Sequence, residues 1–388
     1  MDVIMTVRDT LPQLQAASAN EAGLDAGRLR EAERLIEGAI QTGIFPGAAA
    51  LVARSGTVGW HRAFGHAQVV PRLRIMNPDT IFDLASLTKV IGTVPVALRL
   101  CKEGAFNLDT PVSAILQEFA RDRREQVTIR HLLAHTSGLP SWEALYLRAR
   151  SRQHVLREIC RTPLQNAPGT AVEYSDLGIL LLGFAMEKVT DRRLDRLVRE
   201  VVTEPLRLMQ TGFTPPQELW ECCAATEAGH RYERTKVEAE GRNFPWREDV
   251  LCGEVHDGNA YYAMEGVAGH AGLFSTAWEV ATVAFQWIRP GLFLSSDLVE
   301  EATRDQRQGA EGDPRGFGWI LHHEGTFFEA LGPRSFGHTG FTGTSVAVDP
   351  DPDLVVVLLT NSVHPQADDT RIIEFRLRFH KTVRKALT

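Results

Sequence analysis

Apolar residues recur at helical spacing near the start of the chain. Within residues 27–43 the apolar positions share one helical face, and Gly43 stands where a C-terminal cap is expected; these positions are Leu29, Ala32, Leu35, Ile36, Ala39 and Ile40. The pattern predicts a helix. Residues 47–67 follow as two apolar β-type runs around Arg54, Ser55 and Gly56, which predicts a hairpin.

A second hairpin is predicted near the other end of the chain. Two apolar runs, 344–348 and 354–359, flank a turn at residues 349–352, and the apolar positions of 369–386 predict a final helix. Because hairpins usually pair with their neighbours, the two ends should form one antiparallel sheet flanked by the first and last helices.

The middle of the chain is mostly helical in its periodicity. Segments with helical spacing lie near 87–104, 111–119, 128–134, 152–161, 177–189 and 193–207, whereas 222–262 shows little period and is predicted to be a long loop. We therefore expect an α+β fold with an inserted, mostly helical lobe and a crevice between the lobes. The expected division is an N-terminal extension over 1–23 and one catalytic domain over 24–386, with an α/β lobe (24–80 plus 280–386) and a helical lobe (81–279).

Composition and charge narrow the range of partners. The 388 residues are 44% hydrophobic and 23% charged, as in globular proteins, and the formal net charge of −7 gives no reason to expect nucleic acid or an anionic membrane. The first 23 residues contain no signal-peptide core, and no apolar stretch reaches the ~20 residues of a membrane span. Five cysteines without a CxxC spacing make a disulfide framework unexpected, so the predicted compartment is the cytoplasm.

One serine carries a lysine three residues later. Ser86 and Lys89 precede an apolar run that predicts a helix from about Ser86, and positions i and i+3 of a helix share a face. The helix amino end would add free N–H groups and positive potential at the serine. Alone, the motif is more typical of a helix N-cap followed by a surface lysine in the first turn.

Two further motifs follow in the chain. Tyr174 and Asp176 flank Ser175 in an extended stretch that would point both side chains to the same side. His338, Thr339 and Gly340 precede the last predicted hairpin.

Together the three motifs resemble the serine β-lactamase and penicillin-binding protein superfamily, most of all its class C-like branch, which includes D-alanyl carboxypeptidases, esterases and related amidases. The likeness spans about residues 24–386 and extends to 131–139, 205–206, 211–213, 253–257 and 269–276. It implies an antiparallel sheet with flanking helices joined to a helical lobe, in agreement with the layout above. We expect a small-molecule substrate and neither cofactor nor metal.

The resemblance also implies roles for individual residues. Ser86 would be the acylated nucleophile, Lys89 its electrostatic or basic partner, and Tyr174 the group that relays a proton to the leaving group. The N–H groups of Ser86 and Phe341 would form the oxyanion hole, and Gly340, next to Thr339, would let the acyl group lie along the strand.

Two departures from the motifs bear on the substrate. Asp176 stands where many relatives carry asparagine, and an ionised carboxylate cannot donate to an acyl amide. His338 stands where they carry lysine, which reduces the fixed positive charge that would attract a substrate carboxylate. Both changes favour ester or other amide hydrolysis over β-lactam turnover.

Further histidines and acids are candidates for the cleft. His256, Asp257 and His270 lie among glycines and are candidate cleft residues, whereas the i, i+4 pair His131 and His135 lacks the glutamate of a zinc protease and is interpreted as structural. The prediction is a serine hydrolase that acts through an acyl-enzyme on a small ester or a peptidoglycan-derived or D-amino-acid amide. The alternatives are a β-lactamase or D-alanyl-D-alanine carboxypeptidase, an acyltransferase, and a non-hydrolytic penicillin-recognising module.

Overall fold

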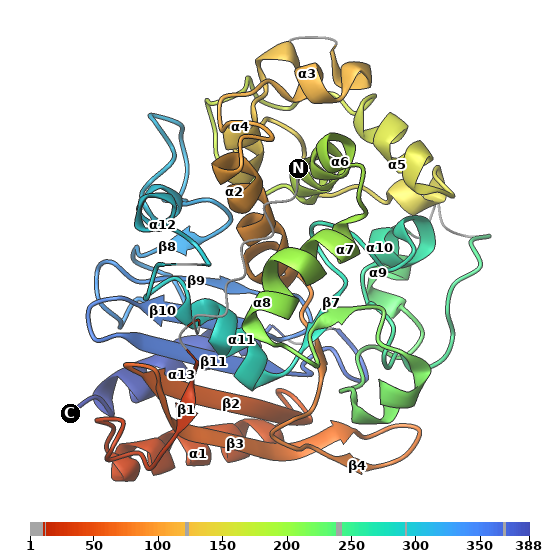
Figure 1. Ribbon diagram of the computed structural model, residues 1–388. Coiled ribbons are helices and arrows are strands. Elements are labelled where there is room, and N and C mark those ends of the chain that lie inside the picture. The colour runs from red at the N-terminus through yellow and green to blue at the C-terminus, as the bar shows by residue number, and fades with distance from the viewer. Residues whose placement is uncertain (1–10, 12, 121–123, 238–242, 292, 368–369) are drawn as a thin grey trace.

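The computed structural model describes residues 11, 13–120, 124–237, 243–291, 293–367 and 370–388, and the structural statements below concern these residues. A large sheet forms one end of the molecule and a mostly helical part forms the other (Figure 1). Eight strands make the sheet, in the order β1-β3-β2-β11-β10-β9-β8 with β4 paired to β3. Their bounds are β1 Gln15–Ala16, β2 Gly47–Arg54, β3 Thr57–Gln68, β4 Arg74–Ile75, β8 Ile320–Leu321, β9 Phe336–Thr339, β10 Ser345–Asp349 and β11 Leu354–Thr360.

The two predicted hairpins are adjacent in this sheet. β2 pairs antiparallel with β3 and β10 with β11, and β11 joins the hairpins by pairing antiparallel with β2, Val356 opposite Val52. The prediction that the ends of the chain share one antiparallel sheet is confirmed. One pair differs, because β1 runs parallel to β3. The sheet thus extends into residues 1–23, which the sequence analysis treats as an extension and of which residues 1–10 and 12 lie outside the described part.

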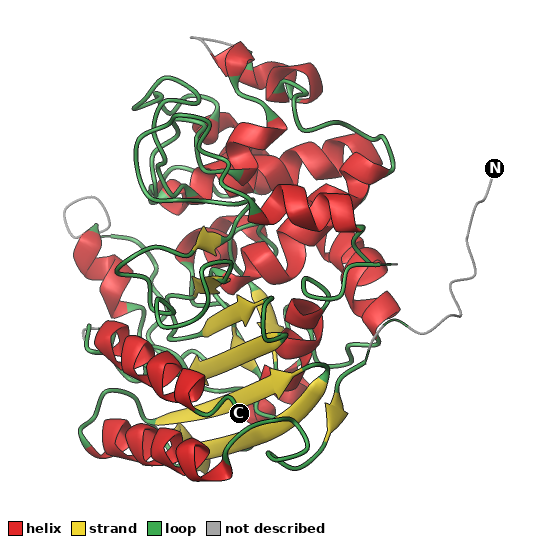
Figure 2. Cartoon of the chain, turned by 90° about the vertical axis from the view of Figure 1, so that its left-hand side faces the viewer, coloured by secondary structure: helices red, strands yellow, loops and turns green. Residues whose placement is uncertain are grey.

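Helices cover both faces of the sheet, so its central strands are apolar throughout. Alternate residues of β2 and β11 enter two cores: Leu51 and Val357 face the large core, whereas Val52 and Val356 face the core beneath the terminal helices. Those helices, α1 (Ala26–Gln41) and α13 (Ile372–Lys385), lie side by side along one face (Figure 2). α11 (Ala277–Phe285) packs on the other face.

The predicted first helix is found nearly as expected. Asp25 caps α1 by accepting the N–H groups of Gly27 and Arg28, and Gly43 has φ 74° just beyond the end of the helix. The apolar face predicted from the sequence is the buried one, with Leu29 and Ile36 nearly inaccessible to solvent.

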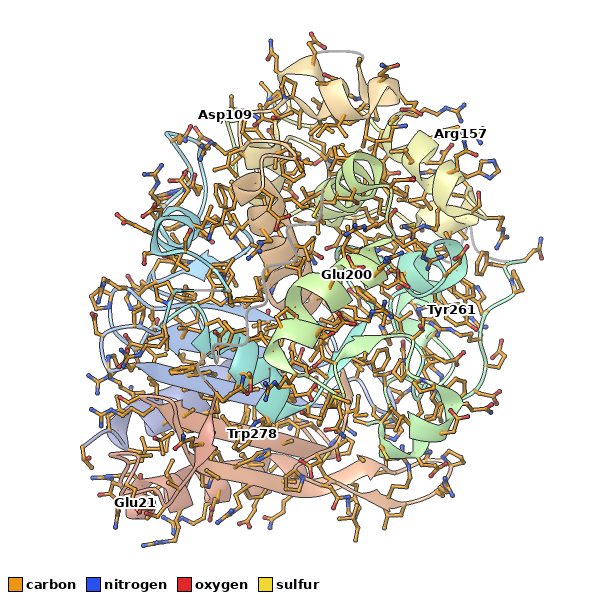
Figure 3. The ribbon with its side chains drawn as sticks, in the orientation of Figure 1. Glu21, Asp109, Arg157, Glu200, Tyr261 and Trp278 are labelled. Carbon is orange, nitrogen blue, oxygen red and sulfur yellow. The ribbon has the colours of Figure 1, made fainter. Side chains whose placement is uncertain are left out.

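The helical part contains short helices between β5 and α11. Their bounds are α2 Val94–Lys102, α3 Val112–Ile115, α4 Ile129–Leu133, α5 Arg152–Ile159, α6 Asp176–Thr190, α7 Leu194–Val198, α8 Glu204–Leu206, α9 Arg231–Lys236 and α10 Gly258–Met264; α12, Ser296–Thr303, follows α11. The exposed side chains of Asp109 and Arg157 lie at the periphery of this part (Figure 3). No helix of the described residues is both long and apolar enough to cross a membrane.

One prediction for the middle of the chain is wrong in detail, and one feature there was not predicted. The supposed loop 222–262 contains α9 and the start of α10, which are too short to produce a visible helical period. A small three-stranded sheet, β5 (Phe82–Asp83), β7 (Leu273–Ser275) and β6 (Gly212–Phe213), also escaped notice, because two or three residues cannot display alternation. The predicted α+β class, with terminal helices on the sheet and a helical lobe, is confirmed.

Candidate active site

Ser86 lies just after β5, at a turn that an acidic side chain holds in place. The two oxygens of Asp83 accept the N–H of Ala85 at 2.9 Å and the N–H of His256 at 2.7 Å. Ala85 has φ 46°, a conformation that L-residues seldom adopt without support. Burial raises the pKa of Asp83, and these two backbone N–H groups oppose that shift. Asp83 therefore stabilises the strained turn that leaves Ser86 partly exposed among buried neighbours.

Lys89 is fully buried and its ammonium group meets three oxygens. Nζ lies 2.9 Å from Ser86 Oγ, 3.1 Å from the carbonyl oxygen of His270 and 2.8 Å from Asp176 Oδ1. Burial alone would lower the pKa of Lys89, but the Asp176 carboxylate and the Tyr174 phenol outweigh it, and the pKa is raised. Lys89 is accordingly an ammonium group at neutral pH.

Tyr174 lies next to both Ser86 and Lys89, in the segment before α6. Its hydroxyl makes side-chain hydrogen bonds with Ser86 and Lys89, and Lys89 Nζ lies 4.8 Å from the centre of its ring. Burial raises the pKa of the phenol, and the charge of Lys89 opposes that shift. Tyr174, Lys89 and Ser86 are thus within mutual reach.

The start of α6 fixes the backbone beside Tyr174. Ser175 is the N-cap: its Oγ accepts the N–H of Gly178 at 3.0 Å and donates to the carbonyl oxygen of Pro140 at 2.7 Å. His135 Nδ1 accepts the N–H of Ser175 at 3.1 Å, and its ring lies 4.7 Å from that of Tyr174. His135, interpreted as structural from the sequence, therefore also orients the segment that carries Tyr174.

His338 lies on β9 as a buried neutral imidazole. Its Nδ1 faces the carbonyl oxygen of Thr339 at 2.8 Å, which assigns the proton to Nδ1. Burial and the nearby cations Arg315 and Lys89 hold its pKa well below the usual range. Its Nε2 has no hydrogen-bond partner among the described residues, and its ring lies 5.8 Å from that of Tyr174.

The turn after β9 lies against the segment before Ser86. Thr342 Oγ1 donates to the carbonyl oxygen of Asp83 at 2.8 Å and Thr344 Oγ1 to that of Leu84 at 3.0 Å. A Cβ at Gly340 would collide with Leu84 O, so only glycine permits this approach. Within the described part of the chain, neither the Ser86 N–H nor the Phe341 N–H donates to another residue. Both donors are free for a ligand.

These groups share one cavity of about 500 Å³. It brings together side chains from all three motifs and from the cleft candidates, and the lining residues that bear on function are Ser86, Tyr174, Asp176, His256, Asp257, His270, Arg315, His338, Thr339 and Phe341. Lys89 lies beneath them, bonded to Ser86.

The cleft candidates form two buried pairs in the cavity wall. His270 Nε2 lies 3.0 Å from Asp257 Oδ1, and His256 Nε2 lies 3.0 Å from Glu227 Oε2. Although burial would raise the pKa of Asp257, His270 outweighs it and the pKa is lowered. Because the carbonyl of His270 also accepts from Lys89, this wall supports the ammonium group.

Arg315 lines the cavity although no sequence pattern indicated it. Its guanidinium lies 5.3 Å from the centre of the Tyr174 ring, makes no ion pair with a described residue, and leaves Nη1 without a hydrogen-bond partner there. Burial lowers its pKa. Arg315 lies in a segment without periodicity, 23 positions before His338, so no sequence signal distinguished it from the many surface arginines.

Comparison with known proteins places the chain among relatives of this architecture. A family model described as Beta-lactamase matches residues 32–380. A protein of Escherichia coli (strain K12) with the provisional name D-alanyl-D-alanine carboxypeptidase is 31% identical, over 92% of this chain and 88% of its own. The N-acetylmuramyl-L-alanine amidase of Bacillus subtilis (strain 168) is 32% identical, over 91% and 85%.

Solved structures show the same fold. EstCE1, described as a hydrolase with promiscuous acyltransferase activity, matches with a TM-score of 0.72 at 22% identity and covers 93% of this chain and 98% of its own. A penicillin-binding protein homologue from Caulobacter crescentus matches with a TM-score of 0.72 at 20% identity, over 94% and 99%. On the match over residues 32–380 and these relatives, the chain belongs to the β-lactamase family, as its motifs indicated.

Proposed function

We propose that the protein is a serine hydrolase that forms an acyl-enzyme at Ser86, with a small ester or a peptidoglycan-derived or D-amino-acid amide as substrate. The observation that carries the proposal is the 2.9 Å contact between Lys89 Nζ and Ser86 Oγ in a cavity that Tyr174 also lines. A hydroxyl within reach of an ammonium and a phenol can pass its proton to this pair as it attacks a carbonyl, once the pair has lost one proton.

The active protonation state carries one proton fewer than the resting site. Lys89 and Tyr174 both have raised pKa values, so each holds its proton at neutral pH. When one proton leaves this coupled pair, the Asp176 carboxylate favours the ammonium form of Lys89, and the phenolate of Tyr174 becomes the base.

Each chemical step then has a named donor or acceptor. Tyr174 takes the proton of Ser86 Oγ as the oxygen bonds to the carbonyl carbon, and it passes that proton to the leaving group as the old bond breaks. The N–H groups of Ser86 and Phe341 stabilise the negative oxygen that develops. Water then attacks the acyl-enzyme, Tyr174 removes its proton, and the serine oxygen leaves with that proton.

Arg315 favours substrates with a carboxylate in the leaving group. Although His338 is neutral, an unpaired guanidinium next to Tyr174 restores positive charge at this end of the cavity. A partly buried cation without an ion-pair partner is costly, and a carboxylate offers it both charge and paired hydrogen bonds. Amides of amino acids with a free carboxylate fit this requirement, and they agree with the names of the two curated relatives.

Replacement of the nucleophile should abolish both turnover and labelling. Ser86→Ala removes the oxygen that bonds to the acyl group. A fluorophosphonate should therefore add its phosphonyl group, with loss of fluoride, to the wild type and not to the variant. Intact mass spectrometry checks this, with Ser296→Ala, an exposed serine on α12, as the control. Equal labelling of wild type and Ser86→Ala would contradict the proposal.

Loss of the phenol should slow proton transfer rather than binding. Tyr174→Phe should lower kcat for an ester by about 10²-fold, the usual contribution of a general base. Tyr261→Phe, whose ring packs on Arg247 away from the cavity, is the matched control. A near-wild-type kcat in Tyr174→Phe would remove this residue from the mechanism.

The pH profile should rise into the alkaline range and respond to Asp176. Because the Lys89 and Tyr174 pair has raised pKa values, kcat/KM for a neutral ester should increase from pH 7 to pH 9. The Asp176 carboxylate contributes to raising both values, so Asp176→Asn should shift the rising limb to lower pH. Steady-state rates from pH 6 to 10 measure this, and a shift to higher pH would contradict the assignment.

Removal of Arg315 should affect one kind of substrate selectively. The test uses two thioester substrates with the same acyl group: one leaving thiol ends in a carboxylate, and the other ends in the methyl ester of that carboxylate. Arg315→Met should reduce kcat/KM for the substrate with the carboxylate about 10- to 100-fold, which corresponds to the loss of a hydrogen bond to a charged group. For the substrate whose leaving thiol ends in the methyl ester, kcat/KM for thioester hydrolysis should equal that of the wild type. An equal change for both substrates would show that Arg315 does not bind the carboxylate.

A further inference from the structure

The peptide group between Gly340 and Phe341 has different surroundings at its two ends. Its N–H, on Phe341, donates to no described residue and belongs to a residue that lines the cavity. Its C=O, on Gly340, accepts a hydrogen bond from Arg376 Nη2 at 3.1 Å. Because the N–H and C=O of a trans peptide point in opposite directions, Arg376 binds this peptide from behind the cavity.

Arg376 is a charged residue on the buried side of α13. α13 also buries Ile372, Phe375, Phe379, His380 and Val383, and Arg376 is the one buried residue of this helix that carries a guanidinium, with 7% of its surface exposed. Nη2 also donates to the carbonyl oxygen of Thr344 at 3.0 Å, and no carboxylate forms an ion pair with Arg376 in the described part of the chain. A buried cation without a counter-ion is expensive, so its presence here calls for a role.

The charge of Arg376 is retained under working conditions. Burial lowers its pKa to about 10, and it therefore remains protonated at neutral pH. The side chain brings a full positive charge to two carbonyl oxygens at the ends of one turn, residues 340–344.

Anchoring alone does not require this charge. Three threonine hydroxyls already tie the same turn to its neighbours: Thr342 to Asp83 O, Thr344 to Leu84 O, and Thr360 to Gly343 O. These neutral hydrogen bonds hold the turn without the cost of a buried cation.

We propose that Arg376 is a positioning residue that strengthens the oxyanion hole from the opposite face of the sheet, by polarising the Gly340–Phe341 peptide so that the Phe341 N–H becomes a better donor. The inference rests on the proposed function, because it requires a negative oxygen at Phe341 in the transition state. A charged donor at one end of a peptide makes its other end a stronger donor, since hydrogen bonds in a chain polarise one another. The effect is specific to the transition state, where the charge on the oxygen is greatest.

The test compares charge with hydrogen bonding at position 376. Arg376→Met removes both, Arg376→Gln keeps a neutral donor, and Arg376→Lys keeps the charge. Arg378→Met is the matched control, because Arg378 is exposed on the same helix. The substrate is a neutral ester, which does not involve Arg315, and rates are expressed per Ser86 titrated with the fluorophosphonate.

The expected result is a loss in kcat with little change in KM. Arg376→Met should lower kcat roughly three- to tenfold, less than the loss of an entire oxyanion donor, because the Phe341 N–H itself remains. An aryl boronic acid, whose tetrahedral anion occupies the same hole, should bind more weakly by a similar factor. Arg376→Lys should recover most of both losses, Arg376→Gln should fall between, and Arg378→Met should match the wild type.

Two results would overturn the inference while leaving the proposed function intact. One is a wild-type kcat and boronate affinity per titrated site in Arg376→Met. The other, which decides the matter even where the methionine variant fails to fold, is equal kcat in the lysine and glutamine variants. Ester hydrolysis by Ser86→Ala at the wild-type rate would instead refute the proposed function, and this inference with it.

Discussion

The site depends on the contacts that the buried ammonium group of Lys89 makes with three surrounding oxygens. Lys89 is fully enclosed, and its charge is compensated by Asp176, by the hydroxyl of Ser86 and by the carbonyl of His270. Ser86 follows β5, Asp176 begins α6 and His270 precedes β7. The contacts of Lys89 therefore hold together three parts of the chain that are distant in sequence. Tyr174 lies beside the same charge. Removal of the Asp176 carboxylate would leave the buried charge without an ion-pair partner among the described residues, which is costly.

The remaining charges act around that centre with different functions. Arg315 faces the cavity and forms no ion pair with a described carboxylate; in the proposed mechanism the substrate supplies that carboxylate. Arg376 lies behind the cavity and donates hydrogen bonds to the carbonyl oxygens of Gly340 and Thr344, and in the further inference its charge acts on the substrate through a peptide group. His338 and His135 are held neutral by burial. Among the described residues the site therefore combines a cation paired with a carboxylate, Lys89, and two cations without one, Arg315 and Arg376; we propose substrate binding for Arg315 and transition-state stabilisation for Arg376.

Sequence patterns predicted those helices and strands in which apolar residues recur over many positions. The apolar face of α1 and the continuous apolar runs of β2 and β11 extend over enough positions to be recognised, and the motifs around Ser86, Tyr174 and His338 are contiguous. Arg315 and Arg376 could not be found in this way, because their significance lies in what surrounds them rather than in their spacing. Arg376 falls within a helix rich in surface arginines, and burial alone distinguishes it from Arg378. The short helices α9 and α10 were missed because tertiary contacts, not periodicity, define them.

The protonation state of Lys89 is the most direct test of this account. A sample labelled with ¹³C at lysine Cε, with the Lys89 resonance assigned by its absence in Lys89→Arg, allows the ammonium group to be titrated by NMR. The account predicts that Lys89 remains protonated at pH values where the exposed lysines have begun to lose their protons, because Asp176 and the phenol raise its pKa. Titration of Lys89 near neutral pH would contradict it, since a neutral amine would then be the base in place of Tyr174.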